Sequence, residues 1–206
     1  MLKVEKFSVM NMDNAIRGAR NPMNSWDRSD SRFDEKGRFI MGENDLSLAR
    51  RLAVAGSDHR KFLRQIFVSA DITAPLYWWK EFDTYKVGTV ANSTSTMHKI
   101  HAKPIEMSDF SHDRMSEEAK VFLQKTIDFL EIRRQKFIES KNRDYWHDII
   151  QLLPSSYNQL RTCTMNYENL TNIYYARRSH KLAEWHVFCD WIISLPYANE
   201  LIKTKD

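Results

Sequence analysis

Side chains suited to binding a polar ligand gather on one predicted helix near the C-terminus, residues 167–178. Asn166 and Arg177 fall on the same face of this helix, at the two ends of an apolar stripe, and Asn172 lies between them. A buried Arg177 needs an anion, so the pattern predicts an anionic ligand or an acidic partner such as Glu184. Asn166 also stands where an N-cap residue belongs, and we keep this structural role open beside ligand binding.

Sequence periodicity predicts the elements that must position these residues. Residues 2–10 are typical of a strand, and the period-two alternation between Phe62 and Ile72 predicts a second one. Helical spacing and stop signals predict the following helices: a short one reaching Arg20, Leu46–Ala55, one opened by Ala74-Pro75, Glu117–Ser140, Asp144–Leu152, Tyr167–Arg178 and Leu182–Leu195. The sum is an α+β fold, helix-rich, with a small mixed or antiparallel sheet.

The chain is expected to form a single domain over residues 1–206, because no repeat or low-complexity tract divides it. Asp45 is expected to cap the helix that begins at Leu46. Residues 21–42 are polar, offer little to bury, and are predicted to be a mobile loop.

Composition excludes several classes of protein. With 42% apolar and 28% charged residues, the chain resembles an average globular protein and not a disordered or collagenous one. It has neither an apolar leader nor an apolar stretch long enough to span a bilayer, so we expect a cytoplasmic protein without membrane contact. Its net charge of +4 suits an anionic ligand but does not demand nucleic acid. The cysteines, Cys163 and Cys189, are expected to be free core thiols.

Other motifs have plainer interpretations. His98 and His101 have a metal-ligand spacing, but no further ligand lies nearby, so we expect no metal. Trp78-Trp79 is predicted to be core, with base stacking as the alternative. Two basic strings are predicted to be solvated faces, with nucleic-acid contact as the alternative; they are Arg60-Lys61-Arg64 and Arg133-Arg134-Lys136.

The chain resembles the flavin-dependent thymidylate synthases, the thymidylate synthase complementing proteins, over about residues 45–190. The resemblance rests on the following motifs: His59-Arg60-Lys61-Phe62 as the family's His-x-x-Phe, Leu153-Pro154, Thr164-x-Asn166, Asn172 and Arg177. The family's signature, Arg-His-Arg-x-x-Ser-x-Asn-x-x-Ser, corresponds here to Thr84-Tyr85-Lys86-Val87-Gly88-Thr89 and then Asn92-Ser93-Thr94-Ser95.

The resemblance implies a fold, a reaction and site residues. It implies FAD as cofactor, with reductive methylation of dUMP or a related pyrimidine nucleotide, NADPH as hydride source and methylenetetrahydrofolate as carbon donor. It further implies a homotetramer with flavin sites between subunits. The residues that it assigns are His59, Lys86, Asn166 and Asn172 for the flavin, and Asn92, Ser95 and Arg177 for the nucleotide, with Arg177 also catalytic.

Departures from the signature leave other functions open. Thr84 and Tyr85 replace basic residues, and neither offers the bidentate grip of arginine on phosphate. A relative without activity that keeps the fold and binds a nucleotide or a partner is therefore one alternative. A basic single-stranded nucleic-acid binder that uses Trp78 and Trp79 is another.

Overall fold

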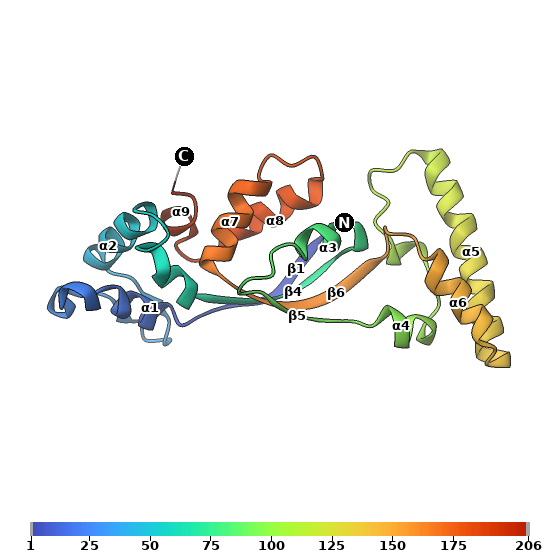
Figure 1. Cartoon of the computed structure of the whole chain (residues 1–206), viewed down its shortest axis with the longest axis horizontal. Helices are drawn as coiled ribbons and strands as arrows, with labels where there is room; N and C mark the ends of the chain where they lie inside the picture. Colours follow the sequence, from blue (N-terminus) through green and yellow to red (C-terminus); the bar gives the residue numbers. More distant parts are fainter. Residues whose placement is uncertain (1, 205–206) are drawn as a thin grey trace. The chain divides into compact units, whose positions relative to one another are not determined.

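The computed structural model describes residues 2–204 and shows a helix-rich α+β fold with a small antiparallel sheet (Figure 1). The four-stranded sheet has the order β1-β4-β6-β5, and β2 and β3 form a separate antiparallel hairpin. The strands are β1 Lys3–Met10, β2 Arg32–Phe33, β3 Phe39–Ile40, β4 Phe67–Pro75, β5 Val90–Ser93 and β6 Asn158–Asn166. The predicted fold class is confirmed.

The helices agree closely with the sequence periodicity. They are α1 Met12–Ala19, α2 Glu43–Val54, α3 Leu76–Phe82, α4 Thr96–Lys99, α5 Glu117–Ser140, α6 Arg143–Leu152, α7 Tyr167–Arg177, α8 Ala183–Ser194 and α9 Ala198–Leu201. Short 3₁₀ helices complete the set: η1 Asn21–Met23, η2 Trp26–Arg28, η3 Arg60–Gln65, η4 Ile100–Ala102 and η5 Met107–Asp109. Amphipathic spacing and the flanking prolines were therefore sufficient to predict the long helices.

The chain divides into two compact units, which we describe separately. Counted over the described residues, unit 1 comprises 2–3, 72–84 and 92–162, and unit 2 comprises 4–71, 85–91 and 163–204. The divisions fall within the strands of the four-stranded sheet, so β1, β4, β5 and β6 each contribute residues to both units. Among residues 2–204 there is no helix that is long and apolar enough to cross a membrane.

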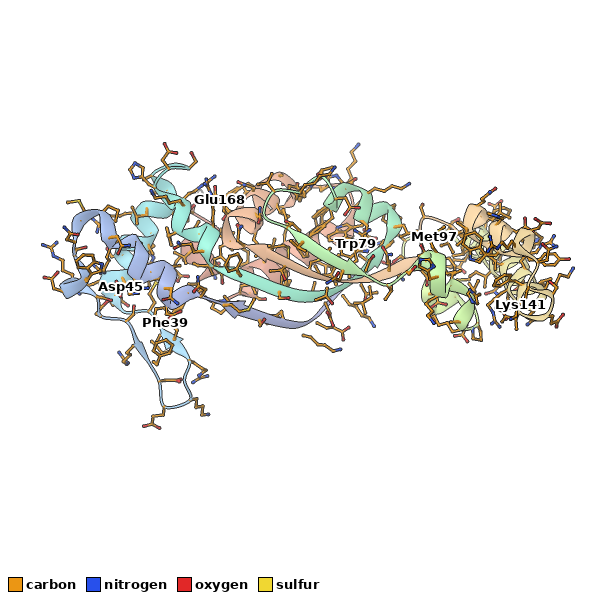
Figure 2. The ribbon with its side chains drawn as sticks, turned by 60° about the horizontal axis from the view of Figure 1, so that its bottom comes forward. Phe39, Asp45, Trp79, Met97, Lys141 and Glu168 are labelled. Atoms are coloured by element: carbon orange, nitrogen blue, oxygen red, sulfur yellow. The ribbon has the colours of Figure 1, made fainter. Side chains whose placement is uncertain are left out.

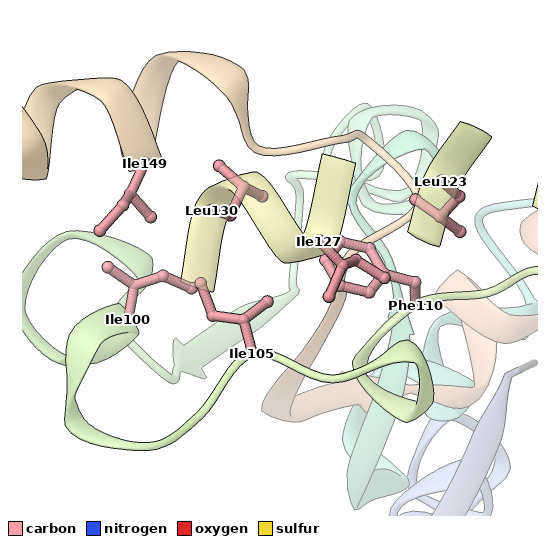
Figure 3. Packing of buried hydrophobic residues seen from close by; sticks show 7 residues of the cluster. All are labelled: Ile100, Ile105, Phe110, Leu123, Ile127, Leu130 and Ile149. Atoms are coloured by element: carbon pink, nitrogen blue, oxygen red, sulfur yellow. The ribbon is translucent and has the colours of Figure 1, made fainter. Parts of the chain in front are cut away.

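Unit 1 is built around the helical hairpin of α5 and α6. Leu123, Ile127 and Leu130 form the predicted apolar stripe of α5 and are buried. Figure 3 shows the cluster that they join: Ile100, Ile105, Phe110, Leu123, Ile127, Leu130 and Ile149. Trp78 and Trp79 are fully buried in the same unit, and Trp79 Nε1 donates to the Gln159 carbonyl over 3.0 Å. The prediction that this pair is core is confirmed.

The start of α2 corrects the prediction that Asp45 caps this helix. The N-cap residue is Gly42, and the carboxylate of Asp30 accepts from the backbone N–H groups of Asn44 and Asp45, over 2.9 and 3.1 Å. Gly42 is required because a Cβ there would lie 2.3 Å from Asp30 Cγ. Asp45 turns inward and pairs with Arg20, which a count of helix positions cannot predict because Arg20 lies on another element.

Two other boundaries differ from the sequence prediction. The second predicted strand, β4, begins at Phe67 and not at Phe62. The reason is that η3 occupies Arg60–Gln65 and buries the consecutive residues Phe62 and Leu63. An alternating strand would place those two on opposite faces. Residues 21–42 contain η1, η2 and the β2–β3 hairpin, so they have more local structure than we expected. Their mobility stays a prediction.

Candidate functional site

Unit 2 places α7 at the end of β6, and a reciprocal pair of amides fixes the junction. Asn166 Oδ1 accepts from the Asn169 backbone N–H over 2.9 Å, and Asn169 Oδ1 accepts from the Asn166 backbone N–H over 3.2 Å. The Tyr167 backbone N–H donates to the Ile66 carbonyl over 3.0 Å. Two of the N–H groups that a helix start leaves unpaired are thus satisfied, and the N-cap role of Asn166 is confirmed.

The segment 85–91 lies against the start of α7. Asn169 Nδ2 donates to the Val87 carbonyl over 2.6 Å. Gly88 follows with a φ of 75°, and a Cβ at this position would lie 2.8 Å from Asn166 Nδ2. The segment can therefore reach the capping amides only with glycine at position 88.

Gly88→Ala is expected to lower the free energy of unfolding by more than Gly37→Ala does. Both glycines have a left-handed φ, which costs alanine about 1–2 kcal/mol. A Cβ at Gly37 meets nothing within 4 Å, whereas one at Gly88 displaces the amides that cap α7, and a lost cap costs a further 0.5–2 kcal/mol or so. Denaturant unfolding of both variants measures the difference, and equal losses would show that the close approach at Gly88 does not matter.

The other end of α7 holds Arg177 between aromatic rings. Its Nε donates to the Tyr85 hydroxyl over 2.8 Å, and its guanidinium carbon lies 4.8 Å from the ring centre of Trp185 and 5.6 Å from that of Tyr85. Trp185 is fully buried on α8, which runs beside α7 (Figure 1). Such contacts fix the plane of the guanidinium, which matters if it is to meet a planar ligand group.

The 3₁₀ helix η3 meets α7 through a buried carboxylate. Glu168, in the first turn of α7, accepts from Arg60 Nε over 3.0 Å and lies 3.4 Å from Arg64 Nε. Glu168 is the labelled residue of α7 in Figure 2. Arg60 is only 16% exposed, so the prediction that this basic string is a solvated face was wrong at Arg60. The second string has a similar exception, because Arg134 pairs with Glu131 and donates to the His101 carbonyl.

His59 precedes η3, is exposed, and lines a pocket of about 840 Å³ between α1, α2 and η3. Lys61 and Phe62 line the same pocket. Neither Lys86 nor the predicted residues of α7 are among the described residues that line it. The structure thus places His59 in unit 2, in a pocket to whose described lining the other predicted ligands do not contribute.

The remaining predicted residues divide between the units. Lys86 and Asn172 are exposed in unit 2, whereas Asn166 is buried there. Asn92 and Ser95 belong to unit 1, where Asn92 is exposed on β5. Ser95 caps α4, accepting from the His98 backbone N–H over 2.9 Å, so the structure shows a structural role for it. Their role with a ligand stays a prediction.

The sequence prediction gave no role to three residues near α7, which are Asn169, Tyr85 and Thr89. Asn169 was detectable, since a second amide three residues after an N-cap asparagine is the spacing of a capping box. Tyr85 was not, because its partner Arg177 is 92 residues away in sequence. Thr89 Oγ1 is buried and has no hydrogen-bond partner within residues 2–204.

The side chains along α7 and the segment 85–91 include several of the kinds that bind anions. Lys86 and Arg177 supply charge, while Thr89 and Asn172 supply uncharged donors. In the part of the chain that the structure describes, no cluster of three or more His, Cys, Asp or Glu is placed to hold a metal ion. Cys163 and Cys189 are buried and form no disulfide, as predicted, and burial raises the pKa of Cys189 to about 12, so its thiol stays protonated at neutral pH.

Comparison with known proteins shows that the chain is similar to solved structures. No protein-family model matches the chain, and no significant match was found among curated proteins. A crystal structure of thymidylate synthase X from Helicobacter pylori with FAD and dUMP matches with a TM-score of 0.76 at 17% identity, covering 100% of both chains. A second structure of the flavin-dependent enzyme from that bacterium, complexed with FAD and dUMP, gives 0.68 at 16% identity, over 98% of this chain and 97% of the other. The chain therefore has the fold of flavin-dependent thymidylate synthase X.

Proposed function

We propose that this chain is a flavoprotein that binds FAD and methylates dUMP or a related pyrimidine nucleotide, as a homotetramer in the cytoplasm. NADPH and methylenetetrahydrofolate are its proposed co-substrates, and residues 1–206 act as one domain. The proposal rests mainly on the similarity in fold, over the whole chain, to structures that hold FAD and dUMP. It is supported by the placement of Asn166 and Arg177 at the two ends of α7, next to the segment that corresponds to the family signature.

The residues around α7 fit a flavin dinucleotide. Thr89 stands at the signature's serine position, and its buried hydroxyl has no partner in the described part of the chain, so a ligand oxygen would satisfy it. Lys86 is exposed beside it and can pair with a phosphate as a point charge. His59, Asn166 and Asn172 are proposed to complete the flavin contacts. The flavin itself supplies hydride transfer when bound.

Arg177 is proposed to bind and polarise the pyrimidine, with Asn92 and Ser95 contacting the nucleotide. Its Nε bond to Tyr85 leaves the guanidinium oriented by the protein before any ligand arrives. Preorganised donors of this kind stabilise negative charge that develops on a substrate. No side-chain nucleophile is needed for this chemistry.

Asn172→Ala is expected to weaken FAD binding by about 1–3 kcal/mol, because a ligand amide or phosphate would lose its partner. The residue is exposed, so the variant should keep its melting temperature. Asn44→Ala, at an exposed helical asparagine of α2, is the matched control. Fluorescence titration with FAD measures both, and equal affinity in the two variants would contradict the assignment of Asn172.

The visible absorption of the purified protein tests the function as a whole. A flavin spectrum together with conversion of dUMP supports the enzyme. The bond that Tyr85 makes to Arg177 favours a second candidate, a relative that binds the nucleotide without turnover, since this hydroxyl stands where the family has a basic side chain. Tight dUMP binding with no product identifies that case. The full burial of Trp78 and Trp79 speaks against base stacking and a nucleic-acid binder.

A further inference from the structure

The longest helix, α5, has apolar residues on two opposite sides, and the described residues of unit 1 bury only one of them. Leu123, Ile127 and Leu130 point into the core cluster of unit 1 (Figure 3). On the other side, exposed residues recur along the helix at alternating steps of four and three, which is the spacing of a coiled-coil seam. This outer stripe comprises Glu118, Phe122, Lys125, Phe129, Ile132, Lys136 and Glu139. Its spacing is that of a helix built to meet a second helix.

The middle of the outer stripe is apolar. Phe122 is 73% exposed, Ile132 is 51% exposed and Phe129 is 38% exposed. Val121, beside Phe122, adds a further exposed apolar side chain. A monomeric protein rarely leaves several large apolar side chains together in water, because a partner that covered them would gain free energy from their burial. The outer stripe is thus typical of an interaction surface.

The charges at the two ends of the outer stripe identify its partner as a second copy of the same helix. When two copies align antiparallel with Ile127 of both at the same level, Glu118 of each lies opposite Lys136 of the other. Phe122 of each then lies opposite Ile132 of the other. The helix is therefore complementary to itself in both charge and apolar surface.

The centre of the outer stripe also favours the antiparallel direction. In this alignment Lys125 lies opposite Phe129, where its methylene groups and its ammonium group can cover the ring. In a parallel alignment every residue would face its own copy, so Lys125 would meet Lys125 and Lys136 would meet Lys136. Like charges placed opposite each other disfavour that alternative.

We propose that the outer stripe of α5 binds the outer stripe of a second copy of this chain, with the two helices antiparallel about a two-fold axis. A two-fold axis follows because each copy uses the same surface. The paired length from Glu118 to Lys136 is about 27 Å, at about 1.5 Å per residue. The pairing supplies one interface of the proposed homotetramer, but it needs neither FAD nor turnover.

Cross-linking at single cysteines tests the alignment. In the antiparallel pair Asp128 lies beside the axis and close to its own copy, whereas the two Glu118 residues are about 27 Å apart. Asp128→Cys is therefore expected to give a covalent dimer with a short bismaleimide, and Glu118→Cys, the matched control, is not. Both positions are exposed, and the native Cys163 and Cys189 are buried, so the native thiols do not compete for the reagent. Equal yields from the two variants, or no dimer from either, would overturn the proposal.

Charge exchange tests the complementarity. Lys136→Glu places a like charge opposite Glu118 and is expected to raise the concentration for half-association at this interface at least about tenfold, measured by sedimentation velocity. Adding Glu118→Lys to the same chain restores opposite charges and should restore association. Lys120→Glu is the matched control, since Lys120 lies on the same helix outside the outer stripe and pairs with Glu117 of its own chain. Equal weakening by the control, or a double variant that does not recover, would overturn the proposal.

The flavin spectrum of the same preparations separates this interface from the proposed function. FAD bound without a cross-link at position 128 would overturn the interface and leave the proposed enzyme standing. A protein that cross-links at position 128 but binds no FAD would support the interface and contradict the flavoprotein. A chain that sediments as a monomer would overturn the proposal and assign the outer stripe to a different partner protein.

Discussion

Arg177→Lys is expected to lower turnover, or nucleotide affinity, by about 10²–10³-fold while the melting temperature stays close to that of the wild type. The side chain is held by a hydrogen bond from Nε to Tyr85 and by contact with the Trp185 ring, so its plane is fixed. Lysine keeps the positive charge but lacks the planar pair of donors with which a guanidinium can bind the pyrimidine of the proposed nucleotide. Steady-state kinetics and thermal unfolding measure the two effects.

Arg178→Lys is the control for this experiment. Arg178 is the next residue, it is exposed, and its guanidinium lies 5.1 Å from the ring centre of Tyr175, so the variant loses a similar cation–π contact without a predicted role at the site. Tyr85→Phe should reproduce part of the effect of Arg177→Lys, since it removes only the acceptor of Nε. An Arg177→Lys variant that melts much earlier but binds the nucleotide normally would show a structural role instead, such as pairing with Glu184.

Asp45→Asn is expected to lower the free energy of unfolding by about 3–5 kcal/mol, because it leaves the charge of Arg20 buried without its partner. Asp45 is fully buried and accepts five hydrogen bonds, which Asn cannot all reproduce because its Nδ2 is a donor. Asp34→Asn is the control, since Asp34 pairs with an exposed arginine, Arg38, on the hairpin. Equal losses in both variants would contradict a special role for the buried pair.

The same pair gives the protein a definite acid dependence. Burial raises the pKa of Asp45, but hydrogen bonds from Ser31, Ser29 and Arg20 outweigh it, so the net pKa is lowered. The stability that this carboxylate contributes is therefore present above its unfolded pKa of about 3.9 and is lost as the pH falls through the folded value. Unfolding curves should converge for the wild type and Asp45→Asn as the medium is acidified. A constant gap between them would show that Asp45 does not titrate as described.

The fold could be predicted from the sequence wherever local periodicity decides the structure. The stripe of Leu123, Ile127 and Leu130 predicts α5, and prolines mark the ends of α6 and α8. The prediction failed where a residue outside the helix takes the role expected of a residue within it. The N–H groups at the start of α2 are capped by Asp30, so Asp45 was released to pair with Arg20, 25 positions away.

At the candidate site, too, local features could be predicted from the sequence and contacts between distant residues could not. The N-cap role of Asn166 follows from its own neighbours, and the sequence therefore indicated it as one of two open roles. The ion pair of Arg60 with Glu168 joins residues 108 positions apart, and nothing in either neighbourhood indicates the other. Ligand roles for His59 and Lys86 rest on resemblance, and no contact in the structure tests them.

The segment around Lys86 is fastened on both sides by side chains of α7. Asn169 holds the Val87 carbonyl on one side, and Arg177 holds the Tyr85 hydroxyl on the other. The Lys86 side chain itself is exposed and takes no part in either of these two hydrogen bonds. Position 86 is thus a place where evolution, or an engineer, can exchange one cation for another or remove it without refolding the loop. In the proposed flavin site, a substitution at position 86 is therefore expected to change ligand preference without changing stability.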